Sequence, residues 1–253
     1  MSEVVLQTHA LVKRFGGITA THDVSLSIQR GARHALIGPN GAGKTTLINQ
    51  LTGVLAPSAG RVELHGRDIT AMAPHKRVAL GLVRTFQINQ LFGTLTPLQS
   101  LAMAVASREG KAHRWWRPLG INAALASECD ALLAQFRLQD HAHQATQALP
   151  YGKRRLLEIA LAVAMRPSVL LLDEPAAGVP AAERQDILAT VAALPADVSV
   201  VLIEHDMDLV FSFATRITVL VNGAVLAEGT PNAIAADPRV KAVYLGEAPV
   251  HRG

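Results

Sequence analysis

The chain has 253 residues, of which 49% are hydrophobic and 17% are charged, and its formal net charge is +4. A chain of this length and composition buries a sizeable core, and its scattered basic residues exclude the long basic run that marks many nucleic-acid-binding proteins. The one cysteine, Cys129, excludes an internal disulfide framework and fits a reducing compartment.

Two observations concern membranes and secretion. The longest stretch without a charge, residues 85–107, is interrupted by polar side chains and by Pro97, so we predict no membrane-spanning helix there. Residues 1–5 lack the basic and then apolar order of a secretion signal. We therefore expect a cytosolic protein that acts at a membrane only through a partner.

The N-terminal part of the chain predicts short strands. Residues 4–6 and 24–28 flank a turn at residues 15–17, and residues 61–66 alternate between apolar and polar with period two. We expect these strands to form an antiparallel flank.

A glycine-rich loop lies between the first predicted strands, after the apolar residues 35–37. It consists of Gly38, Pro39, Asn40, Gly41, Ala42, Gly43, Lys44, Thr45 and Thr46. Its glycines let backbone N–H groups turn toward one anion, and the following helix directs its positive end at the same place. The pattern predicts a loop that cradles a nucleoside triphosphate, with Lys44 on the β- and γ-phosphates and the Thr45 hydroxyl on Mg²⁺. The alternative, a glycine-rich turn without a ligand, is disfavoured by the strand before the loop and the helix after it.

The rest of the chain predicts helices and then parallel strands. Residues 97–149 are alanine-rich and favour helix, for example over 122–138, so we interpret them as a helical insertion. Apolar runs at residues 169–172, 198–203 and 217–221, with a crossover helix at 183–194, are typical of a parallel sheet covered by helices.

Together these elements predict an α/β fold: a P-loop NTPase core with a mainly parallel sheet, an antiparallel β flank and a helical subdomain. We expect a single domain over residues 4–247. Its core covers about 4–95 and 165–230, the helical subdomain about 96–164, and a C-terminal extension 231–253.

Acidic and imidazole side chains follow two of the predicted parallel strands. Asp173 and Glu174 end the first strand, at the sheet edge where ligands bind, and they point to opposite sides. This arrangement predicts Asp173 near Mg²⁺ through water and Glu174 as the base for the water that attacks the γ-phosphate. His205 follows a second strand and is a candidate donor to the γ-phosphate. The alternatives are a charged strand end in solvent and an exposed histidine without a role.

The order of these motifs resembles that of the ATP-binding subunits of ABC transporters, over residues 4–247. The resemblance implies that Phe15 stacks on adenine, that Gln87 senses Mg²⁺ and faces the permease, that Glu174 is the catalytic base and that His205 is the switch histidine. The alternative for Phe15 is a core aromatic, although its position before Gly16 and Gly17 at a strand end favours stacking. Without the resemblance, Gln87 is an ordinary surface amide. The sequences of five short segments are similar to those of the branched-chain amino-acid importer branch: residues 83–87, 149–152, 174–178, 203–207 and 244–247. Relatives in that branch also transport urea, amides or aromatic acids.

The resemblance also implies cofactors and partners. We expect a membrane-associated ATPase at the cytoplasmic face of the inner (plasma) membrane, which uses ATP and Mg²⁺. Its partners are a second ATP-binding subunit, in a homodimer or heterodimer, and integral membrane permease subunits, with no nucleic acid. The alternative is an ABC ATPase that acts on nucleic acid or the ribosome, although such proteins usually carry long coiled coils or tandem nucleotide domains. A GTPase or small-molecule kinase is disfavoured because no Asn-Lys-x-Asp pattern occurs.

Three segments depart from the family pattern or stand outside it. The signature segment, which contacts ATP held by the opposite subunit, is Pro150, Tyr151, Gly152 and Lys153 here, and proline supplies neither a hydroxyl nor an N–H. Pro180 stands where a polar residue usually crosses the dimer interface. Our hypothesis is that this chain completes its partner's site poorly. The basic aromatic cluster around Trp115 and Trp116 has two interpretations. It contacts lipid headgroups of the membrane or a loop of the permease, or it is a solvated loop.

Overall fold

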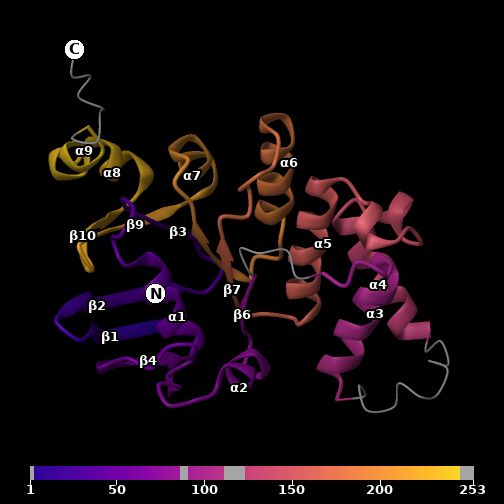
Figure 1. Cartoon of the computed structure of the whole chain (residues 1–253), viewed down its shortest axis with the longest axis horizontal. Coiled ribbons are helices and arrows are strands. Elements are labelled where there is room, and N and C mark those ends of the chain that lie inside the picture. The colour runs from indigo at the N-terminus through magenta and orange to yellow at the C-terminus, as the bar shows by residue number, and fades with distance from the viewer. Residues whose placement is uncertain (1–2, 86–90, 111–122, 246–253) are drawn as a thin grey trace. The chain divides into compact units, whose positions relative to one another are not determined.

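The computed structural model of the chain describes residues 3–85, 91–110 and 123–245 (Figure 1). By its internal contacts the chain divides into two units. The first unit is formed by residues 1–77 and 195–253, and the second by residues 78–194. The division falls within the short helix α2 (Pro74–Ala79).

The first unit holds most of the strands. Before the division, its elements are β1 (Val4–Phe15), β2 (Ile18–Gln29), β3 (Arg33–Ile37), α1 (Lys44–Thr52), β4 (Ala59–Leu64) and β5 (Arg67–Asp68). After residue 195, they are β8 (Ser199–Ile203), α7 (Met207–Phe213), β9 (Arg216–Val221), β10 (Ala224–Gly229), α8 (Pro231–Ala236) and α9 (Pro238–Leu245).

The second unit is mainly helical. Its elements are β6 (Leu82–Arg84), α3 (Pro97–Arg108), α4 (Ala123–Gln135), α5 (Tyr151–Ala164), β7 (Val169–Asp173) and α6 (Ala181–Ala192), with short 3₁₀ helices at residues 139–141 and 146–148.

Strands β2, β1, β4 and β5 form an antiparallel sheet in that order. The first three of them are labelled in Figure 1. Thr8 of β1 lies opposite Leu26 of β2 and Val62 of β4, so the predicted antiparallel flank is confirmed. Both β1 and β2 run for 12 residues, whereas the pattern predicted short strands. The difference arises because backbone pairing also orders polar residues, and the Thr8 hydroxyl adds bonds to Val24 O and from Leu26 N.

The predicted parallel strands are also confirmed. In the first unit, β3 pairs in parallel with β8 and β9, and Ala35 is opposite both Leu202 and Ile217. Strand β8 is fully buried, which explains its continuous apolar run. In the second unit, β6 and β7 pair in parallel, with Val83 opposite Leu170.

Helices α3, α4 and α5 contact one another in the second unit, as expected for the helical insertion. Helix α3 begins at a capping box in which Thr96 and Gln99 bond each other's backbone N–H groups. Within α4, Cys129 is buried, and burial raises the pKa of its thiol, as expected for a small core residue. The proposed limits of the helical subdomain stay a prediction.

The C-terminal end of α1 is held by one buried arginine. The Arg77 side chain donates to four backbone carbonyls, those of Gln50, Leu51, Thr70 and Met72, at 2.6 to 2.9 Å. Burial lowers the pKa of this guanidinium. The last carbonyls of a helix have no partner within the helix. Arg77 satisfies two of them, those of Gln50 and Leu51, and so fixes the end of α1 opposite the glycine-rich loop.

The buried His34 of β3 should make the stability of the fold depend on pH. Its side chain is 1% exposed and its Nε2 lies 2.8 Å from the Thr218 hydroxyl. Burial lowers the pKa of His34 to about 4 from 6.5, partly offset by Glu228. Between these values the unfolded chain binds a proton that the folded chain does not, so the free energy of unfolding should fall, by up to about 3 kcal/mol, as pH drops from 6.5 to about 4.

Urea unfolding between pH 4 and 8 measures this dependence. In His34→Gln the free energy of unfolding should decrease much less between pH 6.5 and 4 than in the wild type. His75 is exposed, so His75→Gln should show the same decrease as the wild type. Equal slopes in wild type and His34→Gln would exclude His34 as the source.

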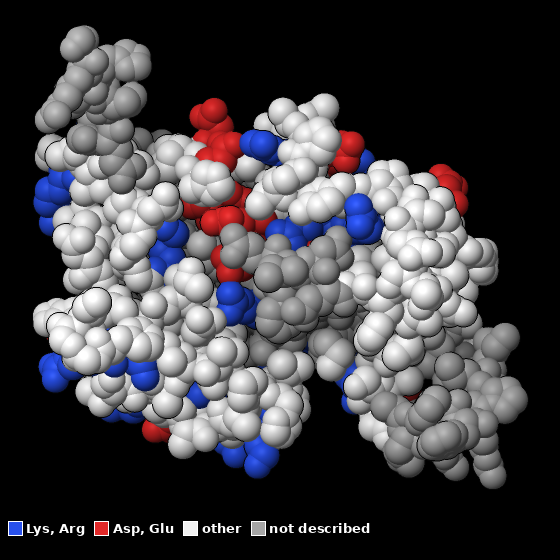
Figure 2. All heavy atoms as spheres, in the orientation of Figure 1, with Lys and Arg blue, Asp and Glu red and all other residues white. Residues whose placement is uncertain are grey.

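Two observations concern the surface. Among the residues that the structure describes, no helix is both long and apolar enough to cross a membrane. On the face drawn in Figure 2, lysines and arginines are spread over several separate places and do not form one continuous basic area.

Candidate active site

The glycine-rich loop follows β3 and leads into α1, as its sequence predicts. Gly43 is the N-terminal cap residue of α1, with a left-handed φ of 98°, and Gly41 is left-handed with a φ of 78°. Ala42 N donates to Pro39 O at 3.1 Å, which closes the loop as a tight turn. The loop therefore presents backbone N–H groups at the N-terminus of a nine-residue helix, where a phosphate binds favourably.

Two of the glycines are required by neighbouring backbone. A Cβ on Gly38 would lie 2.1 Å from Leu220 O, and one on Gly43 would lie 2.4 Å from Ala20 O. A Cβ on Gly41 would meet nothing within 4 Å, so this position needs glycine only for its backbone angle. The sequence pattern predicted close approach to a ligand, and the packing of the loop against β9 and β2 is a second reason that the pattern did not reveal.

Lys44 and the two threonines begin α1. Lys44 Nζ donates to the carbonyls of Gly38 and Pro39, at 2.5 and 3.0 Å, so the ammonium lies over the loop. Thr45 is exposed and Thr46 is half-buried. A cationic amine and a hydroxyl thus stand at the same helix end as the loop N–H groups, as triphosphate binding requires.

Phe15 ends β1 and is 50% exposed, so it is not a core aromatic. Lys13 Nζ lies 5.3 Å from the centre of its ring. An exposed ring of this kind is available for stacking on a flat ligand.

His205 lies at the same sheet edge as the loop. Leu36 of β3 is opposite Ile203 of β8, so the loop and residues 204–206 follow adjacent parallel strands. His205 is exposed, its backbone N donates to the buried Glu204 carboxylate at 3.3 Å, and Asp206 caps α7. The structure therefore brings His205 to the edge where ligands bind in such sheets.

Asp173 ends β7 in the second unit and is 5% exposed. Its Oδ2 accepts a hydrogen bond from Arg84 Nη2 at 2.6 Å, within a nearly buried ion pair. Arg84 ends β6, the strand paired with β7, and sequence reasoning assigned it no role. No strand was predicted at residues 82–84, so no pattern in the sequence placed Arg84 at the end of a parallel strand.

Glu174 follows Asp173 and is half-buried, with a left-handed backbone φ of 46°. Residues other than glycine adopt this region rarely, and such strain is concentrated at functional sites. The backbone angle turns the chain out of β7 at this residue, so Asp173 and Glu174 have different surroundings, as their predicted division of roles requires.

The signature segment begins α5 without a side-chain cap. Pro150 is the N-cap residue and accepts no hydrogen bond through its side chain, as its chemistry dictates. Lys153 Nζ donates to Arg137 O at 2.8 Å, so a contact of this ammonium with a phosphate would require that bond to break. Pro180 has the corresponding place before α6, where it likewise caps nothing. The proposed contact of residues 150–153 with partner-bound ATP stays a prediction.

Some predicted positions lie outside the described residues. These are Gln87, the basic aromatic cluster with Trp115 and Trp116, and the last residues of the C-terminal segment at 244–247.

The described residues fit a Mg²⁺ ion that is held largely by the nucleotide. Among them, no group of three or more carboxylate, imidazole or thiol side chains is placed to hold a metal ion. Mg²⁺ commonly binds through one or two protein oxygens together with substrate phosphates and water. The exposed Thr45 hydroxyl at the start of α1 is an oxygen of this kind.

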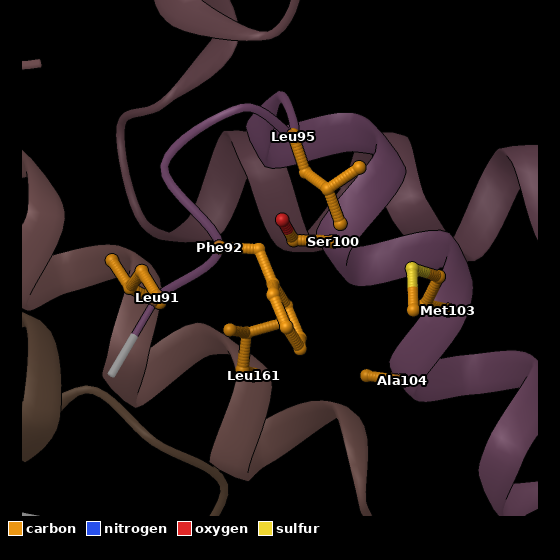
Figure 3. A pocket seen from close by; sticks show the side chains of 7 residues that line it. All are labelled: Leu91, Phe92, Leu95, Ser100, Met103, Ala104 and Leu161. Carbon is orange, nitrogen blue, oxygen red and sulfur yellow. The ribbon is translucent and has the colours of Figure 1, made fainter. Parts of the chain in front are cut away.

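An apolar cavity of about 300 Å³ lies within the second unit (Figure 3). It is lined by Leu91, Phe92, Leu95, Ser100, Met103, Ala104 and Leu161. Phe92 extends toward Leu161 of α5, and it is 68% exposed. The only hydroxyl in this lining, that of Ser100, already donates to the carbonyl of Thr96, the N-cap residue of α3. The cavity thus offers an exposed aromatic and an apolar wall, which suit an apolar partner.

The strand, glycine loop and helix, with Lys44 over the loop, define a P-loop nucleotide-binding protein. The family model described as ABC transporter matches residues 21–177, and the model described as branched-chain amino acid ATP-binding cassette transporter matches residues 224–250. The chain belongs to the ABC transporter family, among its ATP-binding subunits. The predicted P-loop NTPase fold and ATPase class are thereby confirmed.

Known relatives align with nearly the whole chain. The high-affinity branched-chain amino acid transport ATP-binding protein BraF of Pseudomonas aeruginosa is 40% identical, over 98% of this chain and 100% of the relative. LivG of Escherichia coli, described in the same words, is 36% identical with the same coverage. The alternative of a role on nucleic acid or the ribosome is not supported by these relatives.

Solved structures agree with the fold. The ADP conformation of an ATP-binding cassette of an ABC transporter has a TM-score of 0.84 and 31% identity, over 96% of this chain and 99% of that one. A nucleotide-free ATP-binding cassette from an ABC transporter has a TM-score of 0.83 and 31% identity, over 96% and 100%.

Proposed function

We propose that this chain is the ATP-hydrolysing subunit of an importer for branched-chain amino acids or a related small polar or organic-acid solute. The proposed class of solute rests on the match of residues 224–250 to the family model of branched-chain amino acid transporters. These residues lie outside residues 21–177, which match the general model of ABC transporters. The names of the relatives, BraF and LivG, support the same class.

The ATP phosphates bind at residues 38–46. The loop N–H groups and the Lys44 ammonium neutralise the β- and γ-phosphates, and Phe15 stacks on the adenine. Mg²⁺, which Thr45, Gln87 and, through water, Asp173 would hold, supplies neutralisation of charge on the phosphate oxygens. The left-handed loop glycines and the position of Lys44 support this assignment.

Glu174 acts as the base that accepts a proton from the attacking water, and His205 donates a hydrogen bond toward the γ-phosphate. The place of each residue at the carboxyl end of a parallel strand supports these roles. Arg84 holds the Asp173 carboxylate in one orientation through their ion pair.

The proposed assembly contains two ATP-binding subunits, alike or different, and separate integral membrane permease subunits, at the cytoplasmic face of the inner membrane. Residues 150–153 contact ATP held by the partner ATPase. The apolar cavity at Phe92 receives an apolar segment of the permease, which its composition and exposure support (Figure 3).

Reconstitution with candidate permeases tests this function. In proteoliposomes that contain the permeases and a solute-binding protein, ATP turnover should rise when leucine is added, and labelled leucine should accumulate. Phe92→Asp should abolish copurification with the permeases, because a carboxylate cannot enter an apolar contact without a large desolvation cost. The matched change Val54→Asp, at another exposed apolar residue, should leave copurification intact. Turnover and uptake that are indifferent to every permease would contradict an importer.

A further inference from the structure

The loop that follows β7, residues 174–178, is bonded by the first turns of α5. The Arg155 side chain is 3% exposed, its Nη2 donates to Glu174 O at 2.7 Å and its Nε donates to Pro175 O at 3.2 Å. Nη1 pairs with Glu158 Oε2 at 2.7 Å, so the guanidinium is both oriented and neutralised by its own helix. Because the guanidinium group is planar and rigid, its N–H donors hold these two consecutive carbonyls in a fixed geometry.

Tyr151 holds the same loop one helical turn earlier. Its hydroxyl donates to Ala177 O at 3.2 Å, and a Cβ on Gly178 would lie 3.1 Å from that hydroxyl. Residues four apart share one face of a helix, so Tyr151 and Arg155 form a pair of contacts from α5 to the loop.

The carbonyl that Arg155 holds belongs to Glu174, which is one of seven described residues other than glycine with a left-handed backbone. Glu174 is left-handed at φ 46°, and its carbonyl also accepts a bond from Ala177 N at 3.0 Å. A strained backbone of this kind persists only when its surroundings over-determine it. Two donors on one carbonyl, one of them a buried cation, meet that requirement.

We infer that Arg155 is a positioning residue: it fixes the left-handed backbone of Glu174 and thereby the direction of the Glu174 carboxylate. The role of Glu174 in hydrolysis is part of the proposed function, whereas the restraint on the loop is independent of it. Arg155 lies in the helix that begins with residues 150–153. The inference therefore connects the segment proposed to contact partner-bound ATP with the proposed base of this chain's own site.

Hydrogen exchange on the full chain tests the restraint without any nucleotide. Arg155→Lys keeps the charge beside Glu158 but loses the planar fork. We expect exchange of the Ala177 amide, which bonds Glu174 O, to accelerate about tenfold or more, while amides of β7 change by less than about twofold. Arg166→Lys, at a side chain that is 69% exposed and paired with Glu128, is the matched control and should change neither. Unchanged exchange at Ala177, or equal acceleration in β7, would overturn the inference.

Kinetics then separate positioning from general structure. With Mg-ATP, Arg155→Lys should lower kcat by about tenfold and change KM by less than about threefold. In the Glu174→Gln background the same change should have no further effect, because residues that act through one group are not additive. Equal loss in both backgrounds, or an unaltered kcat, would count against a role through Glu174. If Arg155→Lys does not fold, the double change Arg155→Met with Glu158→Met removes both charges and serves in its place.

The two proposals fail in different ways. A wild-type chain that hydrolyses no ATP contradicts the proposed function and leaves the exchange result standing. A wild-type chain that hydrolyses ATP, with no local exchange response at Ala177, contradicts the role of Arg155 alone.

Discussion

Replacing Glu174 by glutamine should lower kcat for Mg-ATP hydrolysis by about 10² to 10³-fold, while the affinity for ATP changes by less than about threefold. Glutamine has nearly the same shape, but its amide oxygen is not basic and cannot accept the proton of the attacking water. The nucleotide contacts assigned to residues 38–46 are untouched by this change. The loss should therefore appear in kcat and not in binding.

Steady-state turnover and equilibrium binding of a fluorescent ATP analogue measure the two effects separately. The matched control is Asp130→Asn, which makes the same kind of change at an exposed residue of α4. Unchanged turnover in Glu174→Gln would remove Glu174 from the role of base. A parallel loss of binding would assign it to the nucleotide contact instead.

Local sequence patterns are sufficient to predict those parts of the candidate site that consist of neighbouring residues. The loop at residues 38–46 is such a part, because its glycines, lysine and threonines are contiguous and follow an apolar strand. Asp173 and Glu174 were predicted for the same reason, since the apolar run of β7 places them at a strand end. In these segments the sequence pattern and the local structure depend on the same few residues.

Contacts between distant segments were not predicted. Arg84 and Asp173 are 89 residues apart, and Arg155 bonds the carbonyl of Glu174 from another element. Backbone carbonyls carry no signature in a sequence, so an arginine that binds them is indistinguishable from a surface arginine on α5. The left-handed backbone of Glu174 is equally hidden, because glutamate does not favour it.

Strand length was underestimated for a related reason. The pattern identified apolar parts of β1 and β2, but the polar residues beyond them belong to the same ladders. Backbone pairing needs no apolar side chain. Hydrophobic periodicity therefore identifies the buried part of a strand and misses the exposed residues that extend the same strand.

Replacing Lys44 by methionine should weaken ATP binding by about 100-fold, which is the largest effect on affinity that we expect from one side chain. The ammonium lies over the loop, in contact with the carbonyls of Gly38 and Pro39. Methionine has a similar length but no charge, so the phosphates lose their cationic partner. The loop glycines and α1 are unaltered, so the fold should persist.

Thermal or urea unfolding with and without Mg-ATP measures this loss without relying on turnover. At an ATP concentration about 100 times the wild-type Kd, binding should stabilise the wild type by about 2.7 kcal/mol, and Lys44→Met by only about 0.4 kcal/mol. Lys76→Met, at an exposed lysine of α2, is the matched control and should be stabilised like the wild type. Glu174→Gln should be stabilised like the wild type too, since only its hydrolysis is impaired. If Lys44→Met were stabilised as strongly as Glu174→Gln, the loop would not be where the phosphates bind. The distinct responses of these two variants thus separate holding the triphosphate from cleaving it.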